Sequence, residues 1–160
     1  MQISKHLTLE ELTFSATAVK LGIQNVPTQN QINNLKIVAD KVFEPMREHF
    51  GVPIKINSGF RIQNLNVAIG GSGTSQHCGG QALDLGLFKD SKITKADLYA
   101  YILNNLDFDQ LIWEFGTSKE PDWVHVSYVS KEKNRRQVLK ALKVDGKTVY
   151  KPIIKASKKK

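Results

Sequence analysis

The spacing of apolar residues changes along the chain, and this change constrains the fold more than any other feature of the sequence. Between Thr28 and Phe50, apolar residues recur every three or four positions, which predicts one long helix. Farther on, the segments 81–87 and 123–129 alternate apolar and polar residues, which predicts strands with one buried face. Because helical segments come first and short strands follow without helical crossovers, we expect an α+β fold whose helices pack on a small antiparallel sheet.

Capping and turn residues predict where the elements begin and end. Thr8 and Thr28 each fit a capping box, and Thr94 fits the start of a later helix. Gly51 is expected to end the long helix, and Pro45 is expected to kink it or to split off its last turn. Further helical turns are expected at 15–21 and 61–69, and further strands at 52–56 and 108–115.

The size and composition are those of one compact domain. The chain has 160 residues, of which 41% are hydrophobic and 24% charged, so it can bury a core of ordinary size. Cys78 is its one cysteine, so the fold must be stable without an internal disulfide. The first residues lack the apolar run of a signal peptide, and no stretch approaches the roughly 20 apolar residues of a membrane helix. We therefore expect a monomer that is made in the cytoplasm.

Positive charge is concentrated at the C-terminal end. Residues 1–130 carry 11 Lys and Arg against 13 Asp and Glu, a net −2, whereas residues 131–160 carry 12 against 2, a net +10. We divide the chain into a domain at 1–140 and a basic segment at 141–160, with a short hairpin turning at Asp145-Gly146 before disordered lysines. Such a segment either binds anionic polymers or is only a solvated surface. We expect it to add affinity for anionic wall polymers without taking part in chemistry.

Three residues form a suitable ligand set for a catalytic metal. His77 lies in a glycine-rich loop, and Asp84 follows it on the polar face of the strand expected at 81–87. His125 lies on the polar face of the strand expected at 123–129. Two histidines and one carboxylate leave the fourth position of a zinc ion open for water. Spacing alone leaves structural or exposed roles open, because most chains of this size contain two histidines and an aspartate.

Three further residues have both a chemical and a structural interpretation. Asp122 precedes His125 by three positions, so it is either a proton acceptor near a metal-bound water or a turn aspartate. Arg61 follows an expected strand and would bind a substrate carboxylate or an oxyanion, unless it is simply a surface arginine. Glu114 follows an apolar run and would either orient a metal ligand or be a surface carboxylate.

Three motifs occur in the order found in a family of zinc peptidases. They are Ser-Gly-Phe-Arg at 58–61, Ser-x-His-x-x-Gly-x-Ala-x-Asp at 75–84 and Asp-x-x-His at 122–125. Together they resemble the D-alanyl-D-alanine carboxypeptidase and L-alanyl-D-glutamate endopeptidase family. The resemblance extends over roughly residues 5–140 and is greatest to a small branch often found in phages and prophages.

The resemblance implies a role for each matching residue. His77, Asp84 and His125 would bind Zn²⁺, Asp122 would be the general base, Arg61 would stabilise the substrate carbonyl oxygen, and Ser75 would support the site by hydrogen bonding. The implied activity is hydrolysis of peptide bonds in bacterial peptidoglycan, either in the stem peptide or at D-Ala-D-Ala. The protein would act on the cell wall after release, and the sequence does not separate a carboxypeptidase from an endopeptidase.

Two other classes of function compete with this interpretation. A non-catalytic, zinc-containing module that binds the cell wall would have the same fold, but the presence of both Asp122 and Arg61 argues against it. A nucleic-acid-binding protein would explain the basic C-terminal end. No helix-turn-helix, zinc-finger or aromatic RNA-binding signature supports it, so we expect no specific nucleic acid partner.

Overall fold

The computed structural model describes residues 1–153, and the terminal lysines expected to be disordered lie outside the described residues. In chain order the first elements are β1 (Gln2–Ser4), β2 (Leu7–Thr8), α1 (Leu9–Thr13), α2 (Ala16–Leu21), α3 (Gln29–Val38), the π-helical turn η1 (Ala39–Phe43) and α4 (Glu44–Phe50). They are followed by β3 (Lys55–Ser58), α5 (Gln63–Ala68), the 3-10 turn η2 (Gln76–Gly79), β4 (Ala82–Gly86), α6 (Lys95–Asn105), β5 (Gln110–Glu114), β6 (Trp123–Ser127), β7 (Gln137–Val144) and β8 (Lys147–Pro152). Between residues 1 and 153, no helix combines the length and the apolar character that a bilayer span requires.

The helix boundaries follow from the capping residues. Capping boxes are present at Thr8 and Thr28 as expected, and a third is present at Thr94. The long helix exists as three consecutive segments, α3, η1 and α4, because Pro45 at the start of α4 lacks the N–H that would continue the helical bonding. Gly51, with a φ of 64°, ends α4 in the left-handed conformation that glycine adopts without strain.

The main sheet is mixed, which confirms the α+β class but corrects the expected antiparallel sheet. In the part of the chain that is described, its order is β3-β4-β6-β5-β7-β8, and β5 pairs with β7 in parallel. The parallel pairing follows from hydrogen bonds between Asp109, just before β5, and the residues that lead into β7. Asp109 accepts hydrogen bonds from the backbone and the guanidinium of Arg135 at 2.8 and 2.7 Å, and its carbonyl accepts the N–H of Gln137. The chain therefore enters β7 beside the start of β5 and runs in the same direction.

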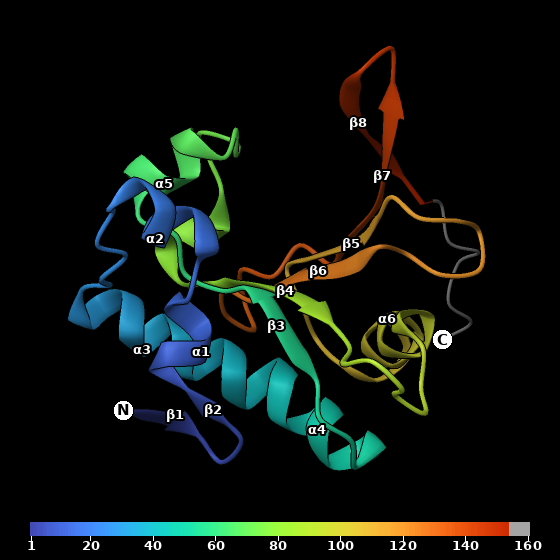
Figure 1. The fold of residues 1–160 in the computed structure, drawn as a ribbon. Helices are drawn as coiled ribbons and strands as arrows, with labels where there is room; N and C mark the ends of the chain where they lie inside the picture. The colour runs from blue at the N-terminus through green and yellow to red at the C-terminus, as the bar shows by residue number, and fades with distance from the viewer. Residues whose placement is uncertain (154–160) are drawn as a thin grey trace.

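The two faces of this sheet have different neighbours. Leucine and valine side chains of β4, β5 and β6 lie in the core with α3, α4 and α6, and these helices gather on one side of the sheet (Figure 1). Because successive side chains of a strand point to opposite faces, the polar residues between them lie on the other side. That second face carries Asp84, Glu114 and His125, so the pleat alone separates the core from the polar site.

The C-terminal hairpin continues the sheet. β7 and β8 are antiparallel, with Val144 opposite Lys147 and a two-residue turn at Asp145 and Gly146. Both turn residues have positive φ, 51° and 76°, as a tight hairpin turn of this kind requires. The hairpin projects beyond the other strands (Figure 1), and residue 140, where we divided the chain, lies within β7.

Candidate metal centre and active site

Two of the expected ligands lie side by side on the sheet. Asp84 of β4 and His125 of β6 are directly opposite each other in the antiparallel pair. Residues opposite each other on one face have side chains about 4.5–5.5 Å apart at Cβ, close enough for both to reach one ion. The strand pairing therefore brings together two residues that are 41 positions apart in the sequence.

The third ligand is held by a tight turn above the sheet. His77 lies in η2, where the hydroxyl of Ser75 accepts the backbone N–H of His77 at 3.3 Å. Gly80 ends the turn with a φ of 73°, and a Cβ at this position would lie 2.5 Å from the carbonyl oxygen of Gln31. Glycine is therefore required at residue 80 both for the backbone conformation and for the close contact with α3.

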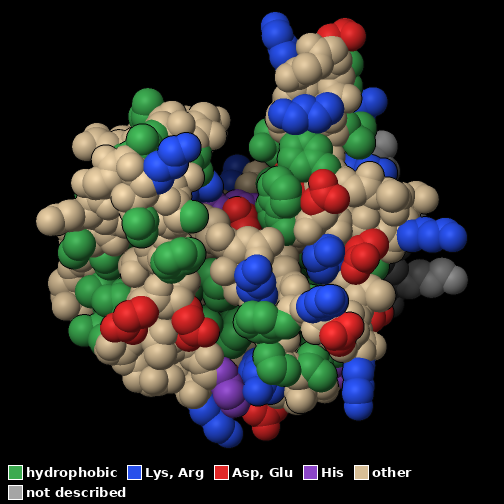
Figure 2. All heavy atoms as spheres, in the orientation of Figure 1, with side chains coloured by type: hydrophobic (Ala, Val, Ile, Leu, Met, Phe, Trp, Pro, Cys, Tyr) green, Lys and Arg blue, Asp and Glu red, His purple; other side chains and the backbone are tan. Residues whose placement is uncertain are grey.

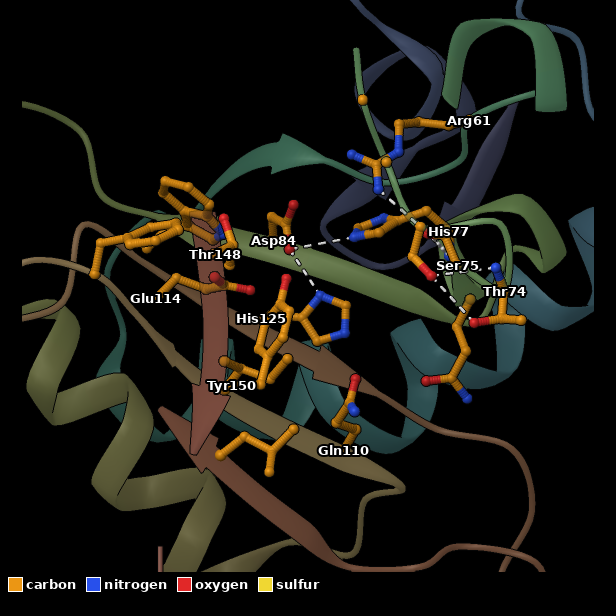
Figure 3. Close-up of a pocket in the computed structure, with 18 of the residues that line it drawn as sticks. Arg61, Thr74, Ser75, His77, Asp84, Gln110, Glu114, His125, Thr148 and Tyr150 are labelled. Atoms are coloured by element: carbon orange, nitrogen blue, oxygen red, sulfur yellow. Dashed lines mark hydrogen bonds and ion pairs between the residues drawn. The ribbon is translucent and has the colours of Figure 1, made fainter. Parts of the chain in front are cut away.

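The three side chains converge on one point (Figure 3). Nε2 of His77 and Nδ1 of His125 lie 3.2 and 3.0 Å from the same oxygen of Asp84, and ligand atoms of all three lie within 4.8 Å of one another. A tetrahedral zinc with bonds of about 2.0–2.1 Å separates its ligand atoms by about 3.4 Å. The spacing of this cluster is thus close to that of a zinc site.

The hydrogen bonding of the histidines also fits a metal. Nδ1 of His77 lies 2.6 Å from the carbonyl oxygen of Gly59, which can only accept, so Nδ1 carries the proton and Nε2 has a free lone pair. Within residues 1–153, Nε2 of His77 is buried and has no hydrogen-bond partner, although it lies 3.2 Å from a carboxylate oxygen of Asp84. Buried nitrogens without partners are costly unless they bind something, and an imidazole lone pair is a good zinc ligand.

The carboxylate of Asp84 has the charge state that a ligand needs. Burial alone would raise the pKa of Asp84, but the charge and the hydrogen bonds of His77 and His125 outweigh burial and hold its pKa well below the usual range. Asp84 is therefore ionised across the neutral range, as metal coordination requires.

A cavity of about 790 Å³ opens over the cluster and is seen as a hollow between two parts of the surface (Figure 2). One wall is formed by Arg61 and the loop that leads to η2. The other wall comes from β5, β7 and β8, through Gln110, Ile112, Glu114, Gln137, Leu139, Lys143, Thr148 and Tyr150. The C-terminal hairpin thus belongs to the cavity, a role that its basic composition did not indicate.

Arg61 and Ser75 lie where a substrate would approach the cluster. Both line the cavity, and the guanidinium of Arg61 donates to the hydroxyl of Ser75 at 3.3 Å (Figure 3). The backbone N–H of Arg61 also donates to the carbonyl of His77 at 3.2 Å. The structure therefore brings these two residues together with the three expected ligands.

Asp122 is the expected site residue that the structure does not bring into the cavity. It is exposed, it precedes β6, and it does not line the cavity. Its backbone N–H donates to the carbonyl of Glu114 at 2.8 Å. Glu114 is only 6% exposed and does line the cavity, and burial raises its pKa to about 7, with His125 lowering it and Asp84 raising it.

Sequence reasoning also missed the importance of Asp109. This carboxylate is 2% exposed and accepts bonds from Arg135 and, at 2.8 Å, from the side-chain amide of Gln76. Gln76 is next to His77 in η2, and Arg135 comes just before β7. Asp109 therefore connects the turn that carries His77 to the start of β7 through its hydrogen bonds. No local pattern in the sequence signals this link, since its three residues come from separate segments.

An open cavity over two histidines and one carboxylate, with an arginine at its wall, is the arrangement of a metallohydrolase active site. The chain belongs to the Peptidase M15 family, whose family model matches residues 5–127, and members of this family are zinc metallopeptidases. Among curated proteins no sequence match was found. The matched segment ends with β6, so the cavity wall formed by β7 and β8 lies beyond it.

Proposed function

We propose that the protein is a zinc-dependent peptidase that hydrolyses peptide bonds of bacterial peptidoglycan, in the stem peptide or at D-Ala-D-Ala. The observation that carries the proposal is the cluster of His77, Asp84 and His125 at the floor of a cavity that is large enough for a short peptide. Membership of the Peptidase M15 family supports the same substrate class.

Each part of the site has a role in this chemistry. His77, Asp84 and His125 would hold the zinc, which supplies a polarised carbonyl and an acidified water when it is bound. Arg61 would stabilise negative charge on the substrate carbonyl oxygen, because its cationic guanidinium lies at the cavity wall. Ser75 would hold Arg61 in this orientation through the hydrogen bond between them.

The charge of the cavity suits a peptide that carries carboxylates. Arg61 and Lys143 line its walls together with Asp84 and Glu114, and Arg135 also lines it but is paired with Asp109. Stem peptides present free carboxylates, which such cationic groups attract. The basic segment at 141–160 would add affinity for anionic wall polymers, as its composition suggests.

The test is to incubate purified, zinc-loaded protein with isolated peptidoglycan and to identify the released products by mass spectrometry. A chelated sample and an Asp84→Ala variant serve as controls. New peptide termini that are absent from both controls are the expected result. Free D-alanine would identify a carboxypeptidase, and cut stem peptides or cross-links would identify an endopeptidase. A folded, zinc-loaded sample that sediments with several wall types but releases nothing would favour the non-catalytic binding module.

A further inference from the structure

The β7–β8 hairpin directs one large side chain toward the metal cluster. In the sheet, Glu114 of β5 is opposite Ala141 of β7, and Ala141 is opposite Tyr150 of β8. Residues opposite each other lie on the same face, so these three side chains form a row across the cavity side of the sheet. Ala141 has the small side chain at the centre of this row, which leaves room for the ring of Tyr150 to extend over β7. Figure 3 shows the Tyr150 side chain pointing into the cavity, toward Glu114 and Asp84.

The hydroxyl of Tyr150 lies near charged groups of both cavity walls. Burial raises the pKa of Tyr150, the negative charges of Glu114 and Asp84 raise it further, and the positive charge of Arg61 lowers it. Because the effect of a charge fades within about 10 Å, the hydroxyl lies close to all three groups. The phenol keeps its proton at neutral pH and can donate a hydrogen bond. Arg61 belongs to the opposite wall, so a peptide above the metal cluster would lie between Arg61 and Tyr150.

Tyr150 is open to a ligand, and its chemistry suits binding one. It lines the cavity and yet is 51% exposed, so a bound molecule can reach both its ring and its hydroxyl. A tyrosine offers a rigid apolar ring with a polar tip, and it loses little conformational entropy when it binds. Closer to the turn of the hairpin, Lys143 donates to the hydroxyl of Thr148 at 3.0 Å, so these two polar groups already have each other as partners.

We propose that Tyr150 is a substrate-binding residue of the peptidase, an inference that rests on the proposed function. Its ring packs against the peptide that lies over the metal cluster, and its hydroxyl donates a hydrogen bond to a carbonyl or carboxylate oxygen of that peptide. Arg61 and Tyr150 hold the peptide from opposite walls, while the two histidines and Asp84 hold the metal beneath it. The family model ends at residue 127, so this contact comes from a part of the chain beyond the matched segment.

The experiment compares wild type with Tyr150→Phe, which removes only the hydroxyl, and with Tyr150→Ala, which removes the ring as well. Tyr101→Phe is the matched control, because Tyr101 stacks on His49 and does not line the cavity. For each zinc-loaded protein we measure kcat and KM on a stem peptide, bound zinc per chain, and the free energy of unfolding in urea. The Kd of the same peptide is measured with chelator present, from tryptophan fluorescence, since Trp123 lines the cavity.

We expect the substitutions at Tyr150 to weaken binding and to leave the chemical step nearly unchanged. Tyr150→Phe should raise KM by about 3–10-fold, the effect of one lost hydrogen bond to the peptide. Tyr150→Ala should raise KM by about 30-fold or more, because the packing against the ring is lost too. The Kd should rise by similar factors while kcat stays within about threefold, as expected when a binding contact is removed. Zinc content should stay at the wild-type value, and Tyr101→Phe should match the wild type in KM and Kd.

The outcomes separate this inference from the function on which it rests. A wild-type protein that binds zinc but cuts no peptidoglycan peptide would overturn the proposed function. Hydrolysis by the wild type, with KM and Kd unchanged in both Tyr150 variants, would overturn the assignment of Tyr150 alone. Loss of zinc or of stability in Tyr150→Phe would also overturn it, because the residue would then support the metal or the fold. If Tyr150→Ala does not fold, Tyr150→Phe provides the test, since it keeps the ring in place.

Discussion

Replacing Glu114 by glutamine should make the metal-free protein more stable at alkaline pH. Burial raises the pKa of Glu114 from 4.5 to about 7 in the folded chain. Below pH 4.5 the carboxyl group is protonated in both the folded and the unfolded chain, so its contribution is fully present. As the pH rises, the unfolded chain releases this proton first, and the folded state loses stability until the pH passes about 7.

The size of the effect follows from the two pKa values. One unit corresponds to about 1.4 kcal/mol, so a rise from 4.5 to about 7 is worth about 3 kcal/mol in the free energy of unfolding. A glutamine at this position does not ionise. The stability difference between Glu114→Gln and wild type should therefore grow by about 3 kcal/mol from pH 4.5 to pH 8. For a domain of this size, that corresponds to a shift in Tm of about 6–12 °C.

The assay is urea unfolding followed by tryptophan fluorescence, between pH 4.5 and 8.5, with chelator present so that no bound metal alters the charge balance. The exposed Glu132→Gln variant is the control and should follow the wild type at every pH. Equal slopes of stability against pH for wild type and Glu114→Gln would show that the Glu114 carboxyl group is not held in a desolvated environment. The conclusion that burial raises the pKa of Glu114 to about 7 would then fail.

Two other regions give further expectations. Arg136 donates to the carbonyls of Leu103 and Leu106 at 2.6 and 2.9 Å and stacks over Phe108, so Arg136→Ala should lower the free energy of unfolding by about 1–3 kcal/mol, measured by urea unfolding at neutral pH. Deleting 147–160 removes β8 and with it two residues of the cavity wall, so activity on a small soluble peptide should fall at least about tenfold, by analogy with other lost positioning contacts. Deleting only the last seven residues should leave that activity intact and weaken sedimentation with cell walls at low salt. If the two deletions lowered the activity on the small peptide equally, the role given to β8 would be contradicted.

Local patterns in the sequence predicted the faces of the strands correctly. Alternation at 81–87 placed Asp84 opposite to the leucines, and alternation at 123–129 placed His125 opposite to Val124 and Val126. Both placements are confirmed, because an apolar face must be buried and the pleat then fixes where the other side chains point. The capping boxes were equally predictable, since each depends on residues within one turn of helix.

Features that depend on long-range contacts were not predictable in the same way. The parallel pairing of β5 with β7 depends on Asp109 and Arg135, which are 26 positions apart. Alternation along a strand also gives the face of each residue without giving its partner, so the diagonal placement of Glu114 beside His125 required the register of β5 on β6. Asp122 was assigned as the general base from its spacing to His125 and from the family resemblance, and this role stays a prediction.

The central claim is that one zinc ion, held by His77, Asp84 and His125, is required for cleavage of peptidoglycan peptides. The most direct test is to titrate the chelator-stripped protein with zinc, and to measure bound metal and newly released amino termini in the same samples. We predict that both rise together and level off at one zinc per chain, and that Asp84→Ala shows neither. Cleavage by the stripped protein that added zinc does not change, or tight zinc binding that survives Asp84→Ala, would contradict the account.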